Sequence, residues 1–229
     1  MQIFVMAQGR QERLPSLKHS KHLLEVNGEP IIVRTLRLLR EFSDGLDVTV
    51  IGHQDVLQRF DVMKNIRRGL TLKNPGFCIL DGLYETLSSC PPSDDRVIFL
   101  LGDVVFSRDA LQKILANRDL YSFAGTNDLS KSKGELFAFG YNTQAQKDVE
   151  LALSTTPCRK VPVGKNQPGH LRNLLVQIAG KEFAFSKDGA PPRSIMFLPI
   201  DDWTADIDTE KDLEKLPFLS QKCLEENHG

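Results

Sequence analysis

The stretch MQIFVMAQGRQERLPSLKHSKHLLEVNGEP, residues 1–30, decides how the rest of the chain is interpreted. It opens with a continuous apolar run over residues 2–7, which has the length of a strand buried on both faces. Gly9 then breaks the run, and the loop that follows gathers the basic residues Arg10, Arg13, Lys18 and Lys21. The stretch therefore predicts a buried first strand with a cationic loop at its carboxyl end.

The chain as a whole does not share this positive charge. Its 229 residues include 29 Lys and Arg against 30 Asp and Glu, a net charge of -1. This balance favours neither nucleic acid nor an anionic membrane, so any anion site must be local. No run approaches the ~18 apolar residues of a membrane span, and the start does not resemble a signal peptide. We expect a cytoplasmic monomer or homodimer with reduced thiols that binds no nucleic acid and no membrane.

The first hundred residues alternate between strand-like and helix-like patterns. Strands are predicted at 2–7, 47–52, 77–80 and 96–106, and helices at 31–42, 55–70 and 82–89. This alternation predicts an α/β fold of three layers, with helices on both faces of a mainly parallel, doubly wound, Rossmann-like sheet.

The second half of the chain is less regular. Strands are predicted at 121–127, 134–142 and 194–200, helices at 144–153, 171–180 and from 208 onward, and a loop at 157–170. Either Asp208 or Thr209 is expected to cap the last helix. We find no repeat and no linker, so we expect one domain over residues 1–229.

Basic residues in the first loop are candidates for binding a phosphate. In open α/β sheets ligands lie beyond the carboxyl ends of the strands, where this loop begins. Gly9 allows close approach of the backbone to a ligand, and Arg13 and Lys21 can neutralise a polyphosphate. A solvated basic loop is the alternative, since the chain has neither a GxGxxG nor a GxxxxGK[ST] motif.

Acidic residues stand at two places where a divalent cation could bind. Asp103 ends the apolar run IFLLGD, and it is either a Mg²⁺ ligand or a turn residue. Asp206 and Asp208 alternate along the segment TADIDTEKDL, so their carboxylates could face one cation. Asp208 could instead serve only as a helix cap.

In this order along the chain, the segments MAQGRQERL, KHLLEVNGEPIIVRTLRLL, LLGDVVFS and DIDTEKDL resemble the motifs of nucleotidyltransferases with a glycosyltransferase-A-like fold. The group includes sugar-phosphate nucleotidylyltransferases and molybdenum-cofactor guanylyl- and cytidylyltransferases. The matching positions are Ala7, Gly9, Arg13, Leu14, Lys21, Leu23, Leu24, Val26, Gly28 and Pro30. The sequence departs from the motifs at Gln8 and Gln11, where small residues are usual, and at Ser20, where Pro is usual.

The resemblance implies a role for each motif. Backbone amides of the first loop would wrap a triphosphate, through Ala7, Gln8, Gly9, Arg10 and Gln11. Arg13 and Lys21 would be catalytic, stabilising charge on the α-phosphate and the departing pyrophosphate. Asp103 and Asp208 would hold Mg²⁺, with Asp206 as a further candidate ligand. The nucleotide would also contact Gly82, Glu85 and Thr86.

The activity implied is transfer of a nucleoside monophosphate from a nucleoside triphosphate to a small phosphorylated acceptor, with release of pyrophosphate. Residues 1–110 would form the nucleotide-binding half and residues 111–229 the acceptor-binding half. The acceptor would be a sugar phosphate or a phosphoalcohol. From the residues themselves, its candidate contacts are Arg159, Lys160, Lys165, His170 and Arg172, and a solvated basic loop is the alternative for most of them.

Two other functions stay open from the sequence. A glycosyltransferase that uses a nucleotide sugar usually carries Asp-x-Asp where this chain has the single Asp103, which argues against that function. A non-catalytic nucleotide-binding module on the same scaffold is the other, and it is motivated by the substitutions at Gln8 and Gln11.

Overall fold

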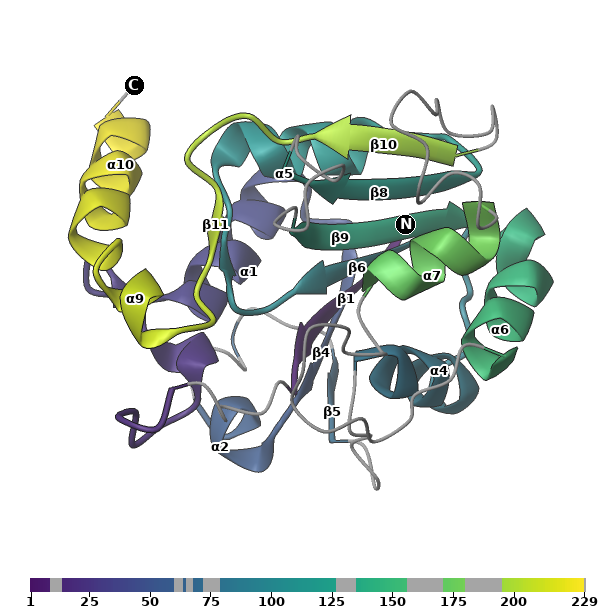
Figure 1. Ribbon diagram of the computed structural model, residues 1–229, viewed down its shortest axis with the longest axis horizontal. Coiled ribbons are helices and arrows are strands. Elements are labelled where there is room, and N and C mark those ends of the chain that lie inside the picture. The colour runs from purple at the N-terminus through teal and green to yellow at the C-terminus, as the bar shows by residue number, and fades with distance from the viewer. Residues whose placement is uncertain are drawn as a thin grey trace.

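A seven-stranded sheet forms the centre of the molecule (Figure 1). The computed structural model describes residues 1–8, 14–59, 64, 68–71, 79–126, 135–155, 171–179 and 195–228. The strands of the sheet are β1 (Gln2–Ala7), β4 (Asp47–Gly52), β5 (Arg68–Leu70), β6 (Arg96–Leu101), β8 (Tyr121–Gly125), β9 (Leu136–Asn142) and β10 (Ile195–Pro199). They lie in the order β10-β8-β9-β6-β1-β4-β5. Only β9 runs against its neighbours β6 and β8, so the prediction of a mainly parallel α/β sheet is confirmed.

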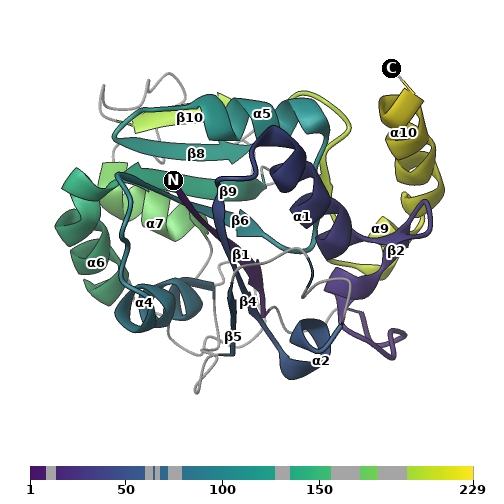
Figure 2. The same ribbon diagram turned by 180° about the vertical axis from the view of Figure 1, so that it is seen from behind.

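Helices cover both faces of this sheet, which makes three layers (Figures 1 and 2). One face packs against α1 (Ile31–Phe42) and α5 (Arg108–Ala116), and the other against α4 (Ile79–Ser89), α6 (Gln146–Thr155) and α7 (Leu171–Ala179). The side chains of β1 alternate between the two layers, with Ile3 and Val5 toward α1, and Phe4 and Met6 toward α4. Because both faces are covered, β1 is apolar at nearly every position, as its sequence predicts.

Two small ladders lie beside the main sheet at its carboxyl edge. A hairpin joins β2 (Glu25–Val26) to β3 (Glu29–Pro30), and its turn residues Asn27 and Gly28 have φ of 54° and 74°. Both residues tolerate this left-handed conformation, so the turn matches its sequence. The second ladder pairs β7 (Val104–Val105) antiparallel with β11 (Ala205–Asp206). It brings the late acidic segment beside the turn that follows β6.

The remaining elements are short or lie near the end of the chain. They are η1 (Lys21–Leu23), α2 (Gln54–Leu57), η2 (Thr143–Ala145), α9 (Glu210–Leu213) and α10 (Leu216–His228). A third apolar cluster joins α10 to the hairpin and to β7, through Val26, Val105, Leu219 and Cys223. No helix in the described ranges has both the length and the apolar character that crossing a membrane requires.

The structure corrects the predicted elements between β4 and α4. The predicted helix 55–70 is wrong, because α2 ends at Leu57 and residues 68–70 form the edge strand β5, parallel to β4. The predicted strand 77–80 is wrong at Ile79 and Leu80, which begin α4. Residues 60–63, 65–67 and 72–78 lie outside the described part of the chain. The spacing of apolar residues favoured a helix here, but residues 68–70 pair instead with the open edge of β4.

Three further differences concern the elements after β6. The apolar run 96–106 does not form one strand, because it turns at Gly102 and Asp103 and continues as β7 in another ladder. The helix α5 was not predicted. The predicted last helix is two helices, and the first of them is capped by Thr209, one of the two caps that the sequence predicts.

A capping box holds the start of α9 and the backbone just before it. The Asp212 carboxylate accepts hydrogen bonds from the Thr209 backbone N–H (2.8 Å), the Thr209 hydroxyl (2.7 Å) and the Asp208 backbone N–H (3.2 Å). Burial alone would raise the pKa of Asp212, but hydrogen bonds from Lys215, Thr209 and the backbone outweigh it and lower this pKa to about 2. The folded protein therefore favours the ionised carboxylate.

We predict that Asp212→Asn lowers the free energy of unfolding by about 1 kcal/mol at pH 7, as the loss of a helix cap usually does. The ionised group stabilises the fold above its ordinary pKa of 3.8, and this contribution is lost as the pH falls toward 2. The difference between wild type and variant in urea unfolding should therefore shrink from pH 7 to pH 3. Asp109→Asn, in the first turn of α5, is the control and should change little. An unchanged gap at pH 3 would contradict the assignment.

Candidate functional site

The candidate site lies at the carboxyl ends of β1 and β6, which pair in parallel with Met6 opposite Leu101. The chain turns sharply after β6, and the Gly102 N–H donates to the Met6 carbonyl oxygen at 2.9 Å. A Cβ at Gly102 would lie 2.8 Å from that oxygen and 3.2 Å from the His22 ring, so only glycine fits. The turn therefore places Asp103 beside both the start of the first loop and η1.

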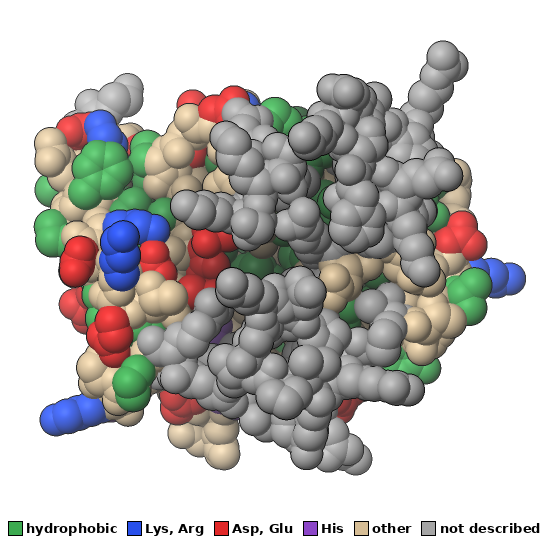
Figure 3. All heavy atoms as spheres, in the orientation of Figure 1, with side chains coloured by type: hydrophobic (Ala, Val, Ile, Leu, Met, Phe, Trp, Pro, Cys, Tyr) green, Lys and Arg blue, Asp and Glu red, His purple; other side chains and the backbone are tan. Residues whose placement is uncertain are grey.

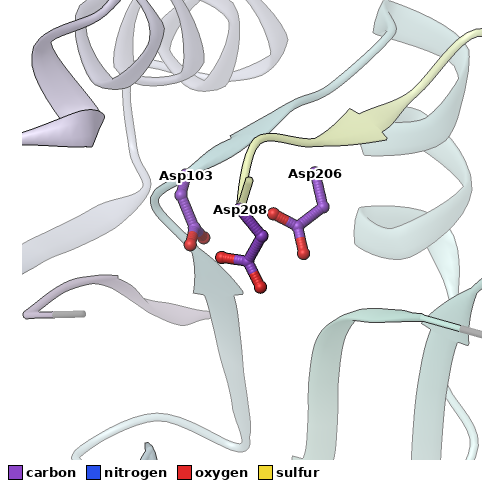
Figure 4. Close-up of side chains that lie close together, drawn as sticks. All are labelled: Asp103, Asp206 and Asp208. Atoms are coloured by element: carbon purple, nitrogen blue, oxygen red, sulfur yellow. The ribbon is translucent and has the colours of Figure 1, made fainter. Parts of the chain in front are cut away.

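Three carboxylates converge on this turn (Figure 4). Asp103 follows β6, Asp206 ends β11, and Asp208 comes two residues later. One oxygen from each carboxylate lies within 4.8 Å of the other two. The β7–β11 ladder sets this arrangement, since Asp206 pairs with Val104 and the Ile207 N–H donates to the Asp103 carbonyl oxygen at 3.2 Å. Asp103, Asp206 and Asp208 are called the acid cluster below.

Lys21 lies against the acid cluster. Its ammonium group forms ion pairs with Asp103 Oδ2 and with Asp208 Oδ1, and its side chain is only 6% exposed. Lys21 belongs to η1, which begins after the first loop, whereas Asp208 lies 187 residues later in the sequence. The structure thus brings together the basic and acidic motifs that the sequence analysis had singled out separately.

The charges in the cluster shift the pKa values of its members. Burial alone would lower the pKa of Lys21, but Asp103 and Asp208 outweigh burial and raise it. Burial would raise the pKa of Asp103, yet the charge of Lys21 and its hydrogen bond hold this pKa below its ordinary value. Burial, with the negative charges of Asp103 and Asp208, raises the pKa of Asp206 to about 9. Lys21 and Asp103 are therefore ionised at neutral pH, whereas Asp206 is protonated in the absence of a cation.

The acid cluster suits a divalent metal ion. Hard oxygen ligands from one or two carboxylates, completed by phosphate oxygens, are the usual surroundings of Mg²⁺. Asp206 Oδ1 is buried and has no hydrogen-bond partner among the described residues, so it is left with unused capacity to bind a cation. The donor set and this unsatisfied oxygen fit such an ion, and its binding remains a prediction.

A buried histidine supports the backbone that carries Lys21. The His22 ring and the Ser20 hydroxyl are hydrogen-bonded, with 2.6 Å between His22 Nδ1 and Ser20 Oγ. Burial lowers the pKa of His22 to about 4, so the ring is neutral at pH 7. Ser20 replaces a proline of the related motif, but its φ of -54° lies within the range that proline adopts. Sequence reasoning assigned no role to His22, and its place beside Lys21 was the only signal for it.

The three residues of α4 that were predicted to contact a nucleotide differ in their burial and in the groups that they contact. Gly82 is buried, and a Cβ there would meet Met6 Cε at 3.3 Å and Gln8 Oε1 at 3.4 Å, so Gly82 lies beside the first loop. The Gln8 carbonyl oxygen accepts a hydrogen bond from His53 Nε2 at 3.1 Å. Thr86 is fully buried, and its hydroxyl donates to the Gly82 carbonyl oxygen at 2.6 Å. Glu85 is half-buried on the same helix.

Several predicted site residues lie outside the described part of the chain. They are Gly9, Arg10, Gln11 and Arg13 of the first loop, and Arg159, Lys160, Lys165 and His170 of the predicted acceptor loop. Residue 172 lies in α7, but its side chain is also outside the described part. Of the loop, the structure describes Ala7, which is buried at the end of β1, and Gln8.

The surface around the site carries charges of both signs. Acidic and basic side chains lie together on the side that carries α9 and α10, in the view of Figure 3. Lys215 pairs with Asp212 and Lys222 with Glu225 on this side. The described surface there is not a basic patch, which agrees with the net charge of -1.

We predict that Gly102→Ala destabilises the protein by about 1–3 kcal/mol, because the added methyl group must move the Met6 backbone or the His22 ring. Gly45→Ala is the matched control, since its nearest contact would be 3.6 Å from Ser43 Oγ. Thermal unfolding of both variants measures the effect. Equal stability of the two variants would show that the turn has more room than its geometry indicates.

Residues 3–150 match the family of MobA-like NTP transferase domains. Solved structures with a similar fold cover nearly the whole chain. A Bacillus anthracis protein assigned as a glucose-1-phosphate thymidylyltransferase has a TM-score of 0.63 at 15% identity, over 96% of this chain and 94% of its own. The inositol-1-phosphate CTP transferase of T. maritima has a TM-score of 0.58 at 14% identity, over 96% and 95% of the two chains.

A third similar structure is the 4-diphosphocytidyl-2C-methyl-D-erythritol synthase of Anaerococcus prevotii, with a TM-score of 0.58 at 12% identity over 97% of each chain. No curated protein sequence matches the chain. At these identities the structures establish the fold, and the family match extends over most of the chain. Family and fold together support nucleotidyl transfer in general. The chain belongs to the family of MobA-like NTP transferase domains.

Proposed function

We propose that the protein is a Mg²⁺-dependent nucleotidyltransferase that moves a nucleoside monophosphate from a nucleoside triphosphate to a small phosphorylated acceptor. One observation carries the proposal. Lys21 contacts Asp103 and Asp208 at the carboxyl edge of β1 and β6, so a cation suited to a phosphate and carboxylates suited to a metal ion share one place. The first loop begins at the same edge with Gln8.

The reaction needs one bond made and one bond broken at the α-phosphorus. An oxygen of the acceptor phosphate attacks the α-phosphorus, the bond to the bridging oxygen breaks, and pyrophosphate leaves. The acceptor oxygen is already ionised near pH 7, because the second pKa of a phosphate monoester is about 6. The protein therefore needs no general base, and its residues position the two anions and offset their charge.

Lys21 would meet the α-phosphate and the departing pyrophosphate as a compact positive charge. Asp103 and Asp208 would hold the ion, which supplies further charge compensation to the phosphate oxygens, with Asp206 as an additional ligand. The neutral His22 and the hydroxyl of Ser20 would keep the Lys21 backbone in place. For the acceptor, we propose a sugar 1-phosphate first and a phosphoalcohol second, since two solved structures of similar fold are named for glucose-1-phosphate and inositol-1-phosphate.

We predict that a screen of four nucleoside triphosphates against pooled sugar phosphates and phosphoalcohols will release pyrophosphate in the presence of Mg²⁺.

Asp103→Asn should lower the rate at least 100-fold without unfolding the protein, because loss of one preorganised charge at a reacting phosphate typically costs ~3–4 kcal/mol of transition-state stabilisation. Asp109→Asn is the matched control, since it removes a carboxylate of α5 outside the acid cluster.

Other outcomes separate the alternatives. Full activity of Asp103→Asn would remove the acid cluster from the mechanism. Release of a nucleoside diphosphate from a nucleotide sugar would indicate glycosyl transfer. Thermal stabilisation by a triphosphate with no pyrophosphate release for any acceptor would indicate a binding module without catalysis.

A further inference from the structure

We propose that Lys21 is the resident cation of the acid cluster in the nucleotide-free protein, and that a divalent ion enters only with a triphosphate that draws the Lys21 ammonium away. This inference rests on the proposed function, since it concerns how the same site is loaded. It makes metal binding and triphosphate binding two parts of one event.

The contacts of Lys21 place its ammonium where a metal ion would bind. The ammonium forms ion pairs with Oδ2 of Asp103 and Oδ1 of Asp208. The three carboxylates of the acid cluster have oxygens within 4.8 Å of one another. A cation bound to the same carboxylates would lie next to this ammonium and be repelled by it, in surroundings where water screens little. The side chain of Lys21 must therefore leave before a divalent ion can bind well.

The backbone around Lys21 is held, so that the side chain alone can make this move. The Leu23 N–H donates to the Ser20 carbonyl oxygen at 2.8 Å, and the Leu24 N–H donates to the Lys21 carbonyl oxygen at 3.1 Å. Hydrogen bonding between His22 and Ser20 adds to this support. The flexible four-carbon stem of a lysine can carry its charge from a carboxylate to a nearby phosphate without moving η1.

A triphosphate supplies what Lys21 needs in order to leave. Its oxygens accept the ammonium in place of the carboxylates, and they complete the coordination of the incoming ion. Oδ1 of Asp206, which has no hydrogen-bond partner in the described part of the chain, can then bind the ion as well. By linkage, a triphosphate must strengthen ion binding by the same factor by which the ion strengthens triphosphate binding.

The test measures Mn²⁺ binding directly, by electron paramagnetic resonance, in the absence of any nucleotide. Wild type should bind Mn²⁺ weakly. Lys21→Met, which removes the resident charge, should bind it at least tenfold more tightly, and Lys21→Arg, which keeps the charge, should bind it as weakly as wild type. Adding Asp103→Asn to Lys21→Met should abolish the gain, because the gained site must use that carboxylate.

Lys215→Met is the matched control. Lys215 pairs with Asp212 close to the cluster, and its side chain is 49% exposed. Its removal changes the net charge by the same amount but leaves the ammonium of Lys21 in place. An equal gain in Lys215→Met and Lys21→Met, or no gain in Lys21→Met, would overturn the proposal.

A second measurement uses wild type only and therefore does not depend on the folding of any variant. Inorganic tripolyphosphate carries the charged part of a nucleoside triphosphate without a base. It should raise the Mn²⁺ affinity of the protein at least tenfold, after correction for Mn²⁺ bound by tripolyphosphate itself. Equal Mn²⁺ affinity with and without tripolyphosphate would contradict the proposal.

Failure of this inference can be told apart from failure of the proposed function, because neither measurement involves turnover. Tight Mn²⁺ binding by Lys21→Met in a protein that releases no pyrophosphate would leave the inference standing and remove the reaction. Pyrophosphate release by a wild-type protein that binds Mn²⁺ tightly without nucleotide would support the proposed reaction and overturn the inference about Lys21.

Discussion

The ion pairs of Lys21 with Asp103 and Asp208 are the interaction on which the site depends. They connect a short helix near the start of the chain to a turn after β6 and to a segment near the end. Three carboxylates so close together would repel one another, and burial adds to the cost of keeping them charged. The buried Lys21 ammonium offsets the charge of Asp103 and Asp208. Asp206, which Lys21 does not contact, is protonated at neutral pH, because its pKa is raised to about 9.

The backbone around this interaction leaves little freedom. Gly102 is packed between the Met6 carbonyl oxygen and the His22 ring, so the turn that carries Asp103 is fixed by the end of β1 and by η1 together. The β7–β11 ladder then sets where Asp206 and Asp208 can lie. The capping box of Thr209 and Asp212 holds the backbone N–H of Asp208 from the other side. Each acidic residue is thus positioned by backbone contacts before any ligand arrives.

Much of the fold could be predicted from the sequence, wherever the spacing of apolar residues was compatible with only one kind of element. The run 2–7 and the helical spacing of 31–42 formed the expected strand and helix, because burial on both faces or on one stripe leaves a clear periodicity. The prediction of a helix over residues 55–70 was wrong, because residues 68–70 pair with an exposed edge of β4. The local sequence pattern does not reveal that pairing. The alternation of Asp206 and Asp208 correctly indicated one shared side. The ion pair of Asp208 with Lys21, in contrast, is a tertiary contact that spacing cannot encode.

The two departures from the related motifs that the structure describes do not disturb the cluster. Ser20 keeps a backbone that proline would also adopt, and Gln8 lies beside Gly82 with its carbonyl oxygen held by His53. A buried group of charges is a poor way to stabilise a fold, since apolar residues of similar volume often do as well or better. A protein that only kept the scaffold would therefore gain little stability from the Lys21, Asp103 and Asp208 arrangement over apolar residues at the same positions. The arrangement offers both signs of charge in one place, which is what the proposed ligand, a triphosphate with a divalent ion, would require.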